Sequence, residues 1–472
     1  MALAIFSEER RKWWTLAAVA FGLFMIMLDN TVVNVALPAI QSDLAADLSE
    51  LQWIVTGYAL SFAALMLIGG KLADAYGRRL MFVAGILVFT LASLWCGLAD
   101  SGDMLITARV IQGMGAALMN PATLSIIAAT FPPKERGMAI GIWAGVSALA
   151  LAIGPLVGGL LTEHLSWHWI FFVNVPVGVI AIAASLLLIT ESKDETHESL
   201  DLPGLGTSAL GLFALTYGLI EANTYGWSSA RIVGSFAVAA LSLAAFLVIE
   251  RRRRAPMLDL TLFRSGTYAG SNVAMLLVAL AMFGVFFFVS LYMQNVLGYS
   301  AVEAGAAFLP MTLIIILVAP IAGKASDKYG SRWLMTIGMV LLGVQLLYLS
   351  QLSTDSGFWN LLPGFVVGGL GMALTMTPTA AAATRAVPVE KSGVGSAVLN
   401  AMRQVGGSLG IALMGAVVAA EAGGRQSLEG FMDGFESALL LAAVIAFVGA
   451  IVAFALVRQE AGQEAAPVEV AA

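Results

Sequence analysis

The chain contains fourteen apolar runs, and each is about long enough to cross a lipid bilayer as a helix. A membrane-spanning helix needs about 20 consecutive, mostly apolar residues. Only 11% of the 472 residues are charged, whereas a soluble globular chain carries about 25%. This composition excludes a soluble protein and predicts an all-α integral membrane protein. The runs lie at residues 14–37, 51–70, 81–99, 104–128, 139–161, 168–189, 203–221, 231–249, 267–291, 302–322, 333–351, 358–383, 394–419 and 435–457.

The charges of the loops between these runs test the count independently. Because cytoplasmic loops carry an excess of Lys and Arg, alternating basic and acidic loops support fourteen spans in the cytoplasmic membrane, with both termini in the cytoplasm. The basic loops hold Lys71, Arg78, Arg79, Lys134, Arg136, Lys193, Arg251–Arg254, Arg264, Lys324, Lys328, Arg332, Arg385 and Lys391. The other loops hold Asp43, Asp47, Glu50, Asp100, Asp103, Glu303, Asp355, Glu429 and Asp433, with Arg231 and Arg425 as the only basic residues.

One stretch of the chain occurs twice. In the first repeat loop, Gly70–Arg79, and the second, Gly323–Arg332, the Gly, Lys, Asp, Tyr, Gly and final Arg keep the same spacing. Each follows the second span of a group of six, as parallel repeats require. We therefore expect an N-terminal six-helix bundle over 1–190, a linker with two extra transmembrane helices over 191–265, a C-terminal six-helix bundle over 266–457, and a disordered cytoplasmic tail over 458–472.

Further motifs lie inside or beside the apolar runs, in register with the repeat loops. They are Leu28–Pro38, Arg109–Gly115, Gly154–Gly159, Trp167–Pro176 and Asn400–Gln404. Together these stretches resemble the signatures of the major facilitator superfamily of secondary transporters, and more narrowly its fourteen-helix branch of drug:proton antiporters. The resemblance covers nearly the whole chain and implies a major facilitator fold, two six-helix bundles plus two inserted transmembrane helices.

The repeat loops carry residues that the resemblance assigns to a gate on the cytoplasmic side. A tight turn there needs glycine for its backbone freedom, and Asp74 is placed to pair with arginines or to cap a helix. The alternative is that the cations only set the topology, which does not explain the glycines and Asp74 at fixed spacing. The expected gate residues are Gly70, Asp74, Gly77, Arg78, Arg79, Asp327 and Arg332.

Two charged residues lie inside the predicted spans and are candidates for proton coupling. Asp29 is the one carboxylate well within a span, and an ionised acid there is costly, so it is a functional residue by default. The alternative is an Asp held permanently by Asn or Thr partners. Arg109 keeps its charge and needs a carboxylate or other acceptors. The resemblance gives Arg109 a part in proton transfer, and a structural ion pair is the alternative.

The fifth predicted span carries a Gly-Pro motif formed by Gly154, Pro155, Gly158 and Gly159. Proline removes a backbone donor and kinks a helix, while glycines permit close contact with a partner helix. Such a motif alone is weak evidence, since any transmembrane helix can contain it. In register with the other motifs, its resemblance to the antiporter signature favours export over uptake.

Candidates for a substrate cavity carry less information. Met and aromatic side chains can line an adaptable binding surface, but the sequence does not separate them from lipid-facing ones. Arg403 is a second intramembrane cation, as consistent with a structural role as with a substrate contact, and Glu221 is also explained as a solvated helix end. The candidate cavity residues are Asn34, Glu221, Tyr292, Met372, Met376 and Arg403.

The function that the resemblance implies is a secondary active transporter that exports lipophilic, often cationic, drugs or toxic compounds in exchange for protons by alternating access. An exporter of a lipid or an endogenous amphipathic metabolite is the alternative. A phosphate-binding loop needs Gly six positions before the Lys of Gly-Lys-[Ser/Thr]; neither repeat loop has it, so we expect neither an ATP-driven pump nor an enzyme. We expect no cofactor beyond the proton motive force, no metal site and no nucleic-acid partner, and a monomer in contact with membrane lipids.

Overall fold

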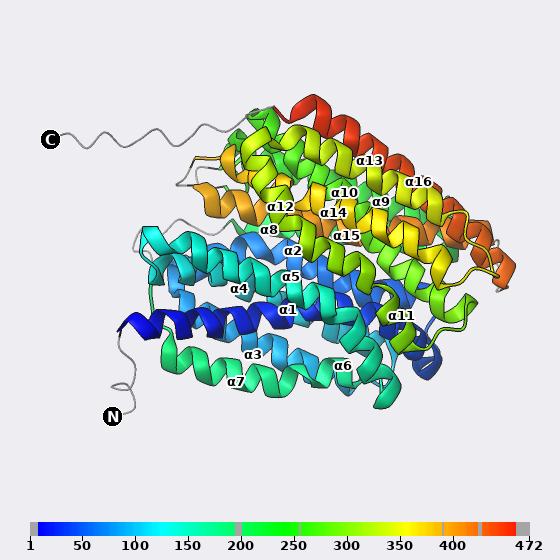
Figure 1. Cartoon of the computed structure of the whole chain (residues 1–472), viewed down its shortest axis with the longest axis horizontal. Helices are drawn as coiled ribbons and strands as arrows, with labels where there is room; N and C mark the ends of the chain where they lie inside the picture. Colours follow the sequence, from blue (N-terminus) through cyan, green and yellow to red (C-terminus); the bar gives the residue numbers. More distant parts are fainter. Residues whose placement is uncertain (1–7, 194–200, 254–255, 389–390, 423–426, 459–472) are drawn as a thin grey trace.

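The computed structural model describes residues 8–193, 201–253, 256–388, 391–422 and 427–458, and all regular elements among them are helical (Figure 1). The first part comprises α1 (Glu8–Leu44), α2 (Leu48–Tyr76), α3 (Arg78–Gly97), α4 (Gly102–Thr130), α5 (Pro133–His164), α6 (Trp169–Phe172) and α7 (Asn174–Leu188). Then follow α8 (Leu202–Tyr225), α9 (Ala230–Arg252) and the short η2 (Leu260–Arg264). The last part comprises α10 (Gly266–Leu291), η3 (Tyr292–Val296), α11 (Ala301–Ala307), α12 (Leu309–Tyr329), α13 (Ser331–Leu349), α14 (Phe358–Arg385), α15 (Ser392–Ala422) and α16 (Leu428–Leu456).

Among the described residues, fourteen helical segments are long and apolar enough to cross a membrane, which confirms the count from the apolar runs. Two runs that were expected to form continuous helices are interrupted instead. The break between α6 and α7 falls three residues before Pro176, and the break between α11 and α12 falls two residues before Pro310. Proline lacks the N–H that would continue the helical hydrogen bonds, which accounts for both interruptions. The expected tail, 458–472, lies almost wholly outside the described residues.

Helices α1–α7 and α10–α16 pack by the same scheme, and we call them the N-terminal half and the C-terminal half. In the N-terminal half, α2 and α3 both pack on α4, α1 packs on α5, and α7 packs on α3 and α1. In the C-terminal half, α12 and α13 both pack on α14, α10 packs on α15, and α16 packs on α13 and α10. This repeated arrangement is that of parallel repeats, in which both halves have the same orientation.

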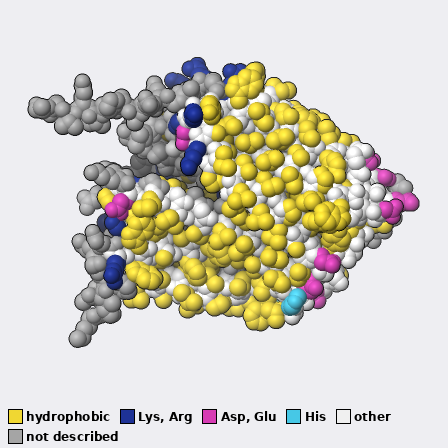
Figure 2. Space-filling view, viewed as in Figure 1, with side chains coloured by type: hydrophobic (Ala, Val, Ile, Leu, Met, Phe, Trp, Pro, Cys, Tyr) yellow, Lys and Arg dark blue, Asp and Glu magenta, His cyan; other side chains and the backbone are white. Residues whose placement is uncertain are grey.

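Charged side chains gather at the two ends of the helices, and an apolar belt lies between them (Figure 2). Side chains such as Leu241 and Leu317 are 72% and 68% exposed in this belt, as expected for a surface that faces lipid tails. We call the end with the repeat loops the basic end and the opposite end the acidic end. The basic end holds Lys71, Arg78, Arg79, Lys324, Lys328, Arg332 and Arg385, and the acidic end holds Asp43, Asp47, Asp100, Asp103, Glu303 and Asp433.

The two halves meet in the part of the molecule toward the acidic end. There α5 packs on α11, and α2 packs on α15. Toward the basic end, a Cβ added to Gly141 or Gly145 of α5, or to Gly393 of α15, would meet no atom within 4 Å, and Figure 2 shows a recess between the halves. The structure is therefore closed at the acidic end and open at the basic end. Hydrogen bonds across the interface run from Ser290 Oγ to Asn34 O (2.9 Å), from Gln294 Nε2 to Val35 O (2.9 Å), from the Val302 N–H to Glu163 Oε2 (2.9 Å) and from Ser408 Oγ to Thr56 O (3.4 Å).

The inserted helices α8 and α9 pack on each other, and α8 also packs on α2 and α15, so it contacts both halves. The segment after α9 returns along the basic end and is tied to the C-terminal half by Lys391, whose Nζ lies 2.6 Å from Asp259 Oδ2. Burial would raise the pKa of Asp259, but hydrogen bonds from Lys391 and Thr261 outweigh it and hold that pKa below its ordinary value.

Candidate functional site

Asp29 of α1 and Arg109 of α4 form an ion pair inside the N-terminal half. Arg109 Nη1 lies 2.5 Å from Asp29 Oδ2, and the two side chains are at most 1% exposed. Both residues were expected to take part in proton coupling, and the structure brings them together although 80 positions separate them in the chain. Asp29 therefore has a charged partner, which the alternative of an acid held by Asn or Thr partners did not include.

Three further polar side chains complete the network around this pair. Gln112, one turn after Arg109 on α4, accepts from Arg109 Nη1 at 2.6 Å and donates to Asp29 Oδ1 at 2.9 Å. Its amide also lies 2.8 Å from Ser93 Oγ of α3, and Asn174 at the start of α7 reaches Asp29 Oδ1 at 3.5 Å. Each Asp29 oxygen therefore has a donor. Sequence reasoning missed Gln112, although its position three residues after Arg109 places it on the same helix face.

The Arg109 guanidinium lies near two aromatic rings. Its central carbon is 4.2 Å from the centroid of the Tyr58 ring on α2 and 5.7 Å from that of Phe171 on α6. Its Nε donates to the Ile54 carbonyl at 3.1 Å. A guanidinium over an aromatic face gains about 2 kcal/mol when water is excluded, so these rings help to offset the cost of burying the charge. Tyr58 also places this network beside α15, on which α2 packs.

The two residues of this pair depend on each other electrostatically. Both charges are stripped of water, and their mutual attraction offsets this cost only while both are present. A proton on Asp29 would remove its charge and leave Arg109 without a counter-ion. The packing of α1 against α4 therefore depends on the charges of both residues.

The first repeat loop folds as a tight turn between α2 and α3. Gly77 has φ +126°, in the region that favours glycine, and a Cβ there would lie 2.7 Å from the Glu191 carboxyl carbon. Asp74 accepts from Arg78 at 2.9 Å, and the Arg79 N–H donates to Glu191 Oε1 at 3.0 Å. These charged groups thus bond within the N-terminal half in this conformation, and Glu191 is a partner that the sequence motif did not indicate.

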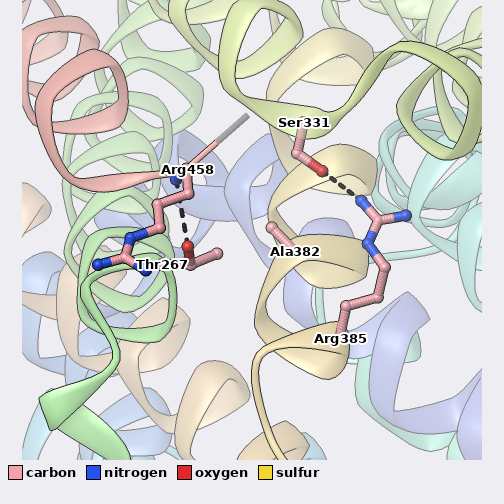
Figure 3. A pocket seen from close by; sticks show the side chains of 5 residues that line it. All are labelled: Thr267, Ser331, Ala382, Arg385 and Arg458. Carbon is pink, nitrogen blue, oxygen red and sulfur yellow. Dashed lines mark hydrogen bonds between the residues drawn. The ribbon is translucent and has the colours of Figure 1, made fainter. Parts of the chain in front are cut away.

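The aspartate of the second repeat loop is also paired with an arginine, but this arginine comes from another helix. Ser331 stands where the first loop has Arg78, and Arg385 at the end of α14 replaces the missing guanidinium. Arg385 Nη1 lies 2.8 Å from Asp327 Oδ1, and its Nη2 donates to Ser331 Oγ at 2.6 Å (Figure 3). Arg332 lies over the Phe454 ring at 4.0 Å instead. The second repeat loop has Ser331 where the first has Arg78, and this missing cation was the one sign in the sequence that another arginine pairs with Asp327.

The Gly-Pro motif of α5 lies where the two halves meet. A Cβ at Gly158 would lie 2.6 Å from the Val32 carbonyl oxygen of α1, while one at Gly159 would touch the Ala301 carbonyl of α11. On the other side of this contact, a Cβ at Gly305 would touch the Pro155 carbonyl. The small residues therefore let α5 approach one helix of its own half and one of the other half. Gly154 packs in the same way on Thr31 of α1.

The structure does not bring the six candidate cavity residues together. Tyr292 is buried, donates to the Ser353 carbonyl at 2.6 Å and stacks on Phe435, so it packs within the C-terminal half near the acidic end. Asn34 is 8% exposed, and its carbonyl accepts the bond from Ser290 described above. Met372 and Met376 are partly buried on α14 and pack on the core.

The interpretation of Glu221 as a solvated helix end is wrong. Helix α8 continues to Tyr225, and Glu221 Oε1 accepts hydrogen bonds from Ser49 Oγ at 2.7 Å and Trp53 Nε1 at 3.2 Å. Two positions further, Asn223 Nδ2 donates to the Ala416 carbonyl of α15 at 2.7 Å. Glu221 therefore joins α8 to α2 at the acidic end. Arg403 is partly exposed on α15 and is considered below.

The sequence profile of the Major Facilitator Superfamily matches residues 19–410 and 271–472. The chain belongs to the major facilitator superfamily. Among its relatives in this superfamily, the tetracenomycin C resistance and export protein of Streptomyces glaucescens is 40% identical over 414 residues, which cover 88% of this chain and 77% of that protein. The puromycin resistance protein of Streptomyces alboniger is 36% identical over 472 residues, which cover 97% of this chain and 94% of that protein.

Solved structures of major facilitator transporters have the same fold. An auto-inhibited peptide transporter of the POT family superposes with a TM-score of 0.68 over 96% of this chain and 98% of its own, at 16% identity. A bacterial homologue of the human lysosomal transporter Spinster, solved in an inward-facing and unoccupied conformation, superposes with a TM-score of 0.64 over 94% of this chain and 96% of its own, at 20% identity. At these identities the likeness shows the fold alone.

Proposed function

We propose that this major facilitator transporter exports lipophilic small molecules from the cytoplasm in exchange for protons by alternating access. Two relatives of this chain are named for resistance to an antibiotic and one of these also for export, which supports drugs or toxic compounds as substrates. The observation that carries the proton coupling is the buried ion pair of Asp29 and Arg109.

The orientation in the membrane follows from the charges of the two ends. Cytoplasmic loops carry the excess of Lys and Arg, so we place the basic end in the cytoplasm and the acidic end outside. The recess between the halves then opens to the cytoplasm, from which an exporter takes its substrate. In this conformation the Gly-Pro motif of α5 and the contacts of α2 with α15 close the outer side.

Coupling through Asp29 takes an indirect form in this proposal. Direct competition between a cationic substrate and a proton would require that the substrate can reach the Asp29 carboxylate. In the structure that carboxylate is fully buried in the N-terminal half and bound to Arg109 and Gln112, so a substrate between the halves does not reach it. Protonation of Asp29 instead changes how α1 packs against α4, and α1 is in contact with α10 of the other half.

The test is transport by purified protein in liposomes with an imposed pH gradient. For Asp29→Asn we expect accumulation of a lipophilic substrate against its gradient to fall to the level of empty liposomes, because the side chain can no longer take up and release a proton. Downhill exchange of the same substrate should persist. The matched control is Asp103→Asn, an exposed acid at the acidic end, which should transport as the wild type does. Full pH-driven accumulation by Asp29→Asn would refute the assignment.

A further inference from the structure

Arg403 lies deep within α15, and no carboxylate among the described residues pairs with it. By helical rise it is about 17 Å from the start of the helix at Ser392, near the middle of a bilayer core about 30 Å thick. The side chain is partly exposed and has no hydrogen bond or ion pair with any residue that the structure describes. A guanidinium keeps its charge at any physiological pH, and a charge at this depth almost always has a partner or faces a water-filled cavity.

Tyr58 is the side chain that faces Arg403 from the other half. Helices α2 and α15 run antiparallel in contact, with Thr56 opposite Ser408, and continuing this register one turn toward the basic end places Tyr58 near Arg403. The two side chains interact electrostatically. The Tyr58 hydroxyl is buried and has no hydrogen-bond partner among the described residues. The Asn30 side chain lies beside it, and the Asn30 amide donates one hydrogen bond to the Ile26 carbonyl. The Tyr58 O–H and the Arg403 guanidinium thus both lack a partner among the described residues, on the side of the interface toward the basic end.

A group that would satisfy both side chains must be an acceptor and must carry negative charge. Among the described residues no carboxylate pairs with Arg403, and the buried Asp29 already binds Arg109 and Gln112. The recess at the basic end is the route by which a ligand would approach. An amphipathic molecule entering it would meet Arg403, which is partly exposed on α15.

We propose that Arg403 and the Tyr58 hydroxyl bind an acidic group of an amphipathic substrate, such as a carboxylate, phenolate or phosphate. This inference rests on the proposed function and narrows it, since the sequence alone suggested substrates that are often cationic. It also links the substrate to the proton site through one side chain. The Tyr58 ring carries Arg109 on its face, while its hydroxyl would bind the substrate anion.

The test compares three fluorescent probes that share one apolar body: pyrenebutyric acid, its methyl ester, and a pyrenebutyl trimethylammonium. Binding to the full-length protein in detergent and in phosphatidylcholine nanodiscs is measured against empty nanodiscs. Charge-assisted hydrogen bonds predict that the acid binds about 10- to 100-fold more tightly than the ester. Arg403→Gln should bring the dissociation constants of the acid and the ester within about two-fold of each other. Arg403→Lys should retain part of the preference for the acid. Tyr58→Phe should weaken the binding of the acid and leave that of the ester unchanged.

Two sources of the acidic group remain to be separated, a cytoplasmic compound and the headgroup of an anionic lipid. If phosphatidylglycerol co-purifies with the wild type but not with Arg403→Gln, as measured by mass spectrometry, the site holds a lipid headgroup. If no lipid co-purifies and the acid probe binds as described, it holds a soluble substrate. Both results support the anion site.

Three probe results count against the proposal: no probe binds, the ester or the ammonium binds as well as the acid, or Arg403→Gln leaves the preference for the acid unchanged. The proposal is overturned if one of these is found and no anionic lipid depends on Arg403 for co-purification. Thermal unfolding of each variant shows whether it is folded when measured. Binding needs no pH gradient, so the two proposals can fail separately. The acid probe can fail to bind while proton-driven export is observed, and it can bind even if Asp29→Asn shows that Asp29 does not couple export to protons.

Discussion

At the scale of single residues, the pairing of Asp29 with Arg109 decides what each can do. A buried ion pair adds little net stability, because desolvating two charges costs about as much as their attraction returns. Removing one partner is far more costly, because the other charge is left in a dry site. The pair therefore adds little to the stability of the fold while both charges are present, and losing one of them is costly.

This view predicts a non-additive effect on stability. Asp29→Leu and Arg109→Met should each destabilise the protein by about 3–5 kcal/mol, whereas the double variant should recover most of that loss. Thermal unfolding of the purified variants in detergent measures this coupling, and a double variant less stable than both single ones would contradict it. As a control, Asp74→Ala and Arg78→Ala break a partly exposed pair at the basic end and should each cost at most about 1 kcal/mol. The folded double variant should still lack proton-driven transport.

At the scale of helices, α8 connects the two halves on one side of the molecule. Through Glu221 it binds Ser49 and Trp53 of α2, and through Asn223 it binds the Ala416 carbonyl of α15. All these contacts lie toward the acidic end. The inserted pair therefore stabilises the closed state of that end in this conformation.

Removing these bonds should let the acidic end open more often. In a Cys96→Ser background, which removes the one native cysteine, Ser290→Cys places a reporter at the buried interface. We expect Glu221→Ala with Asn223→Ala to raise the rate of maleimide labelling roughly five-fold per hydrogen bond lost, at about 1 kcal/mol each. Thr207→Ala on α8, whose hydroxyl bonds only within its own helix, is the control and should not change the rate. An unchanged rate in the double variant would show that α8 is not a clamp.

At the scale of the whole molecule, the proposed alternating access requires the contacts at the acidic end to break. A Cβ at Gly415 of α15 would touch the Gln52 amide of α2, so this position joins the halves closely. Alternating access requires the two helices to separate there when the outer side opens.

A cross-link at this point should stop transport reversibly. With Gln52→Cys and Gly415→Cys in the Cys96→Ser background, oxidation should join the halves and abolish transport, and reduction should restore it. The control pair is Leu349→Cys with Gly364→Cys, which lie close together within the C-terminal half and should leave transport intact when oxidised. Transport at the full rate by the cross-linked Gln52–Gly415 pair would contradict alternating access at this interface.

The sequence by itself determined the number of spans, the two related halves and the charge of each end. These features are local, because every membrane-spanning helix must satisfy its own backbone hydrogen bonds in lipid and so appears as a separate apolar run. The motif residues Asp29 and Arg109 could also be singled out, since charges inside such runs are rare and costly.

Only the tertiary structure decided which of these residues meet. In lipid-facing helices nearly every side is apolar, so periodicity does not show which face packs against which neighbour. Helix rotation and contacts between distant segments therefore decide the pairing of Asp29 with Arg109 and the use of Arg385 as the cation of the second repeat loop. They also decide that Arg403 has no partner in the part of the chain that the structure describes. The same reason explains why Glu221 and Tyr292, expected in a cavity, lie at contacts near the acidic end.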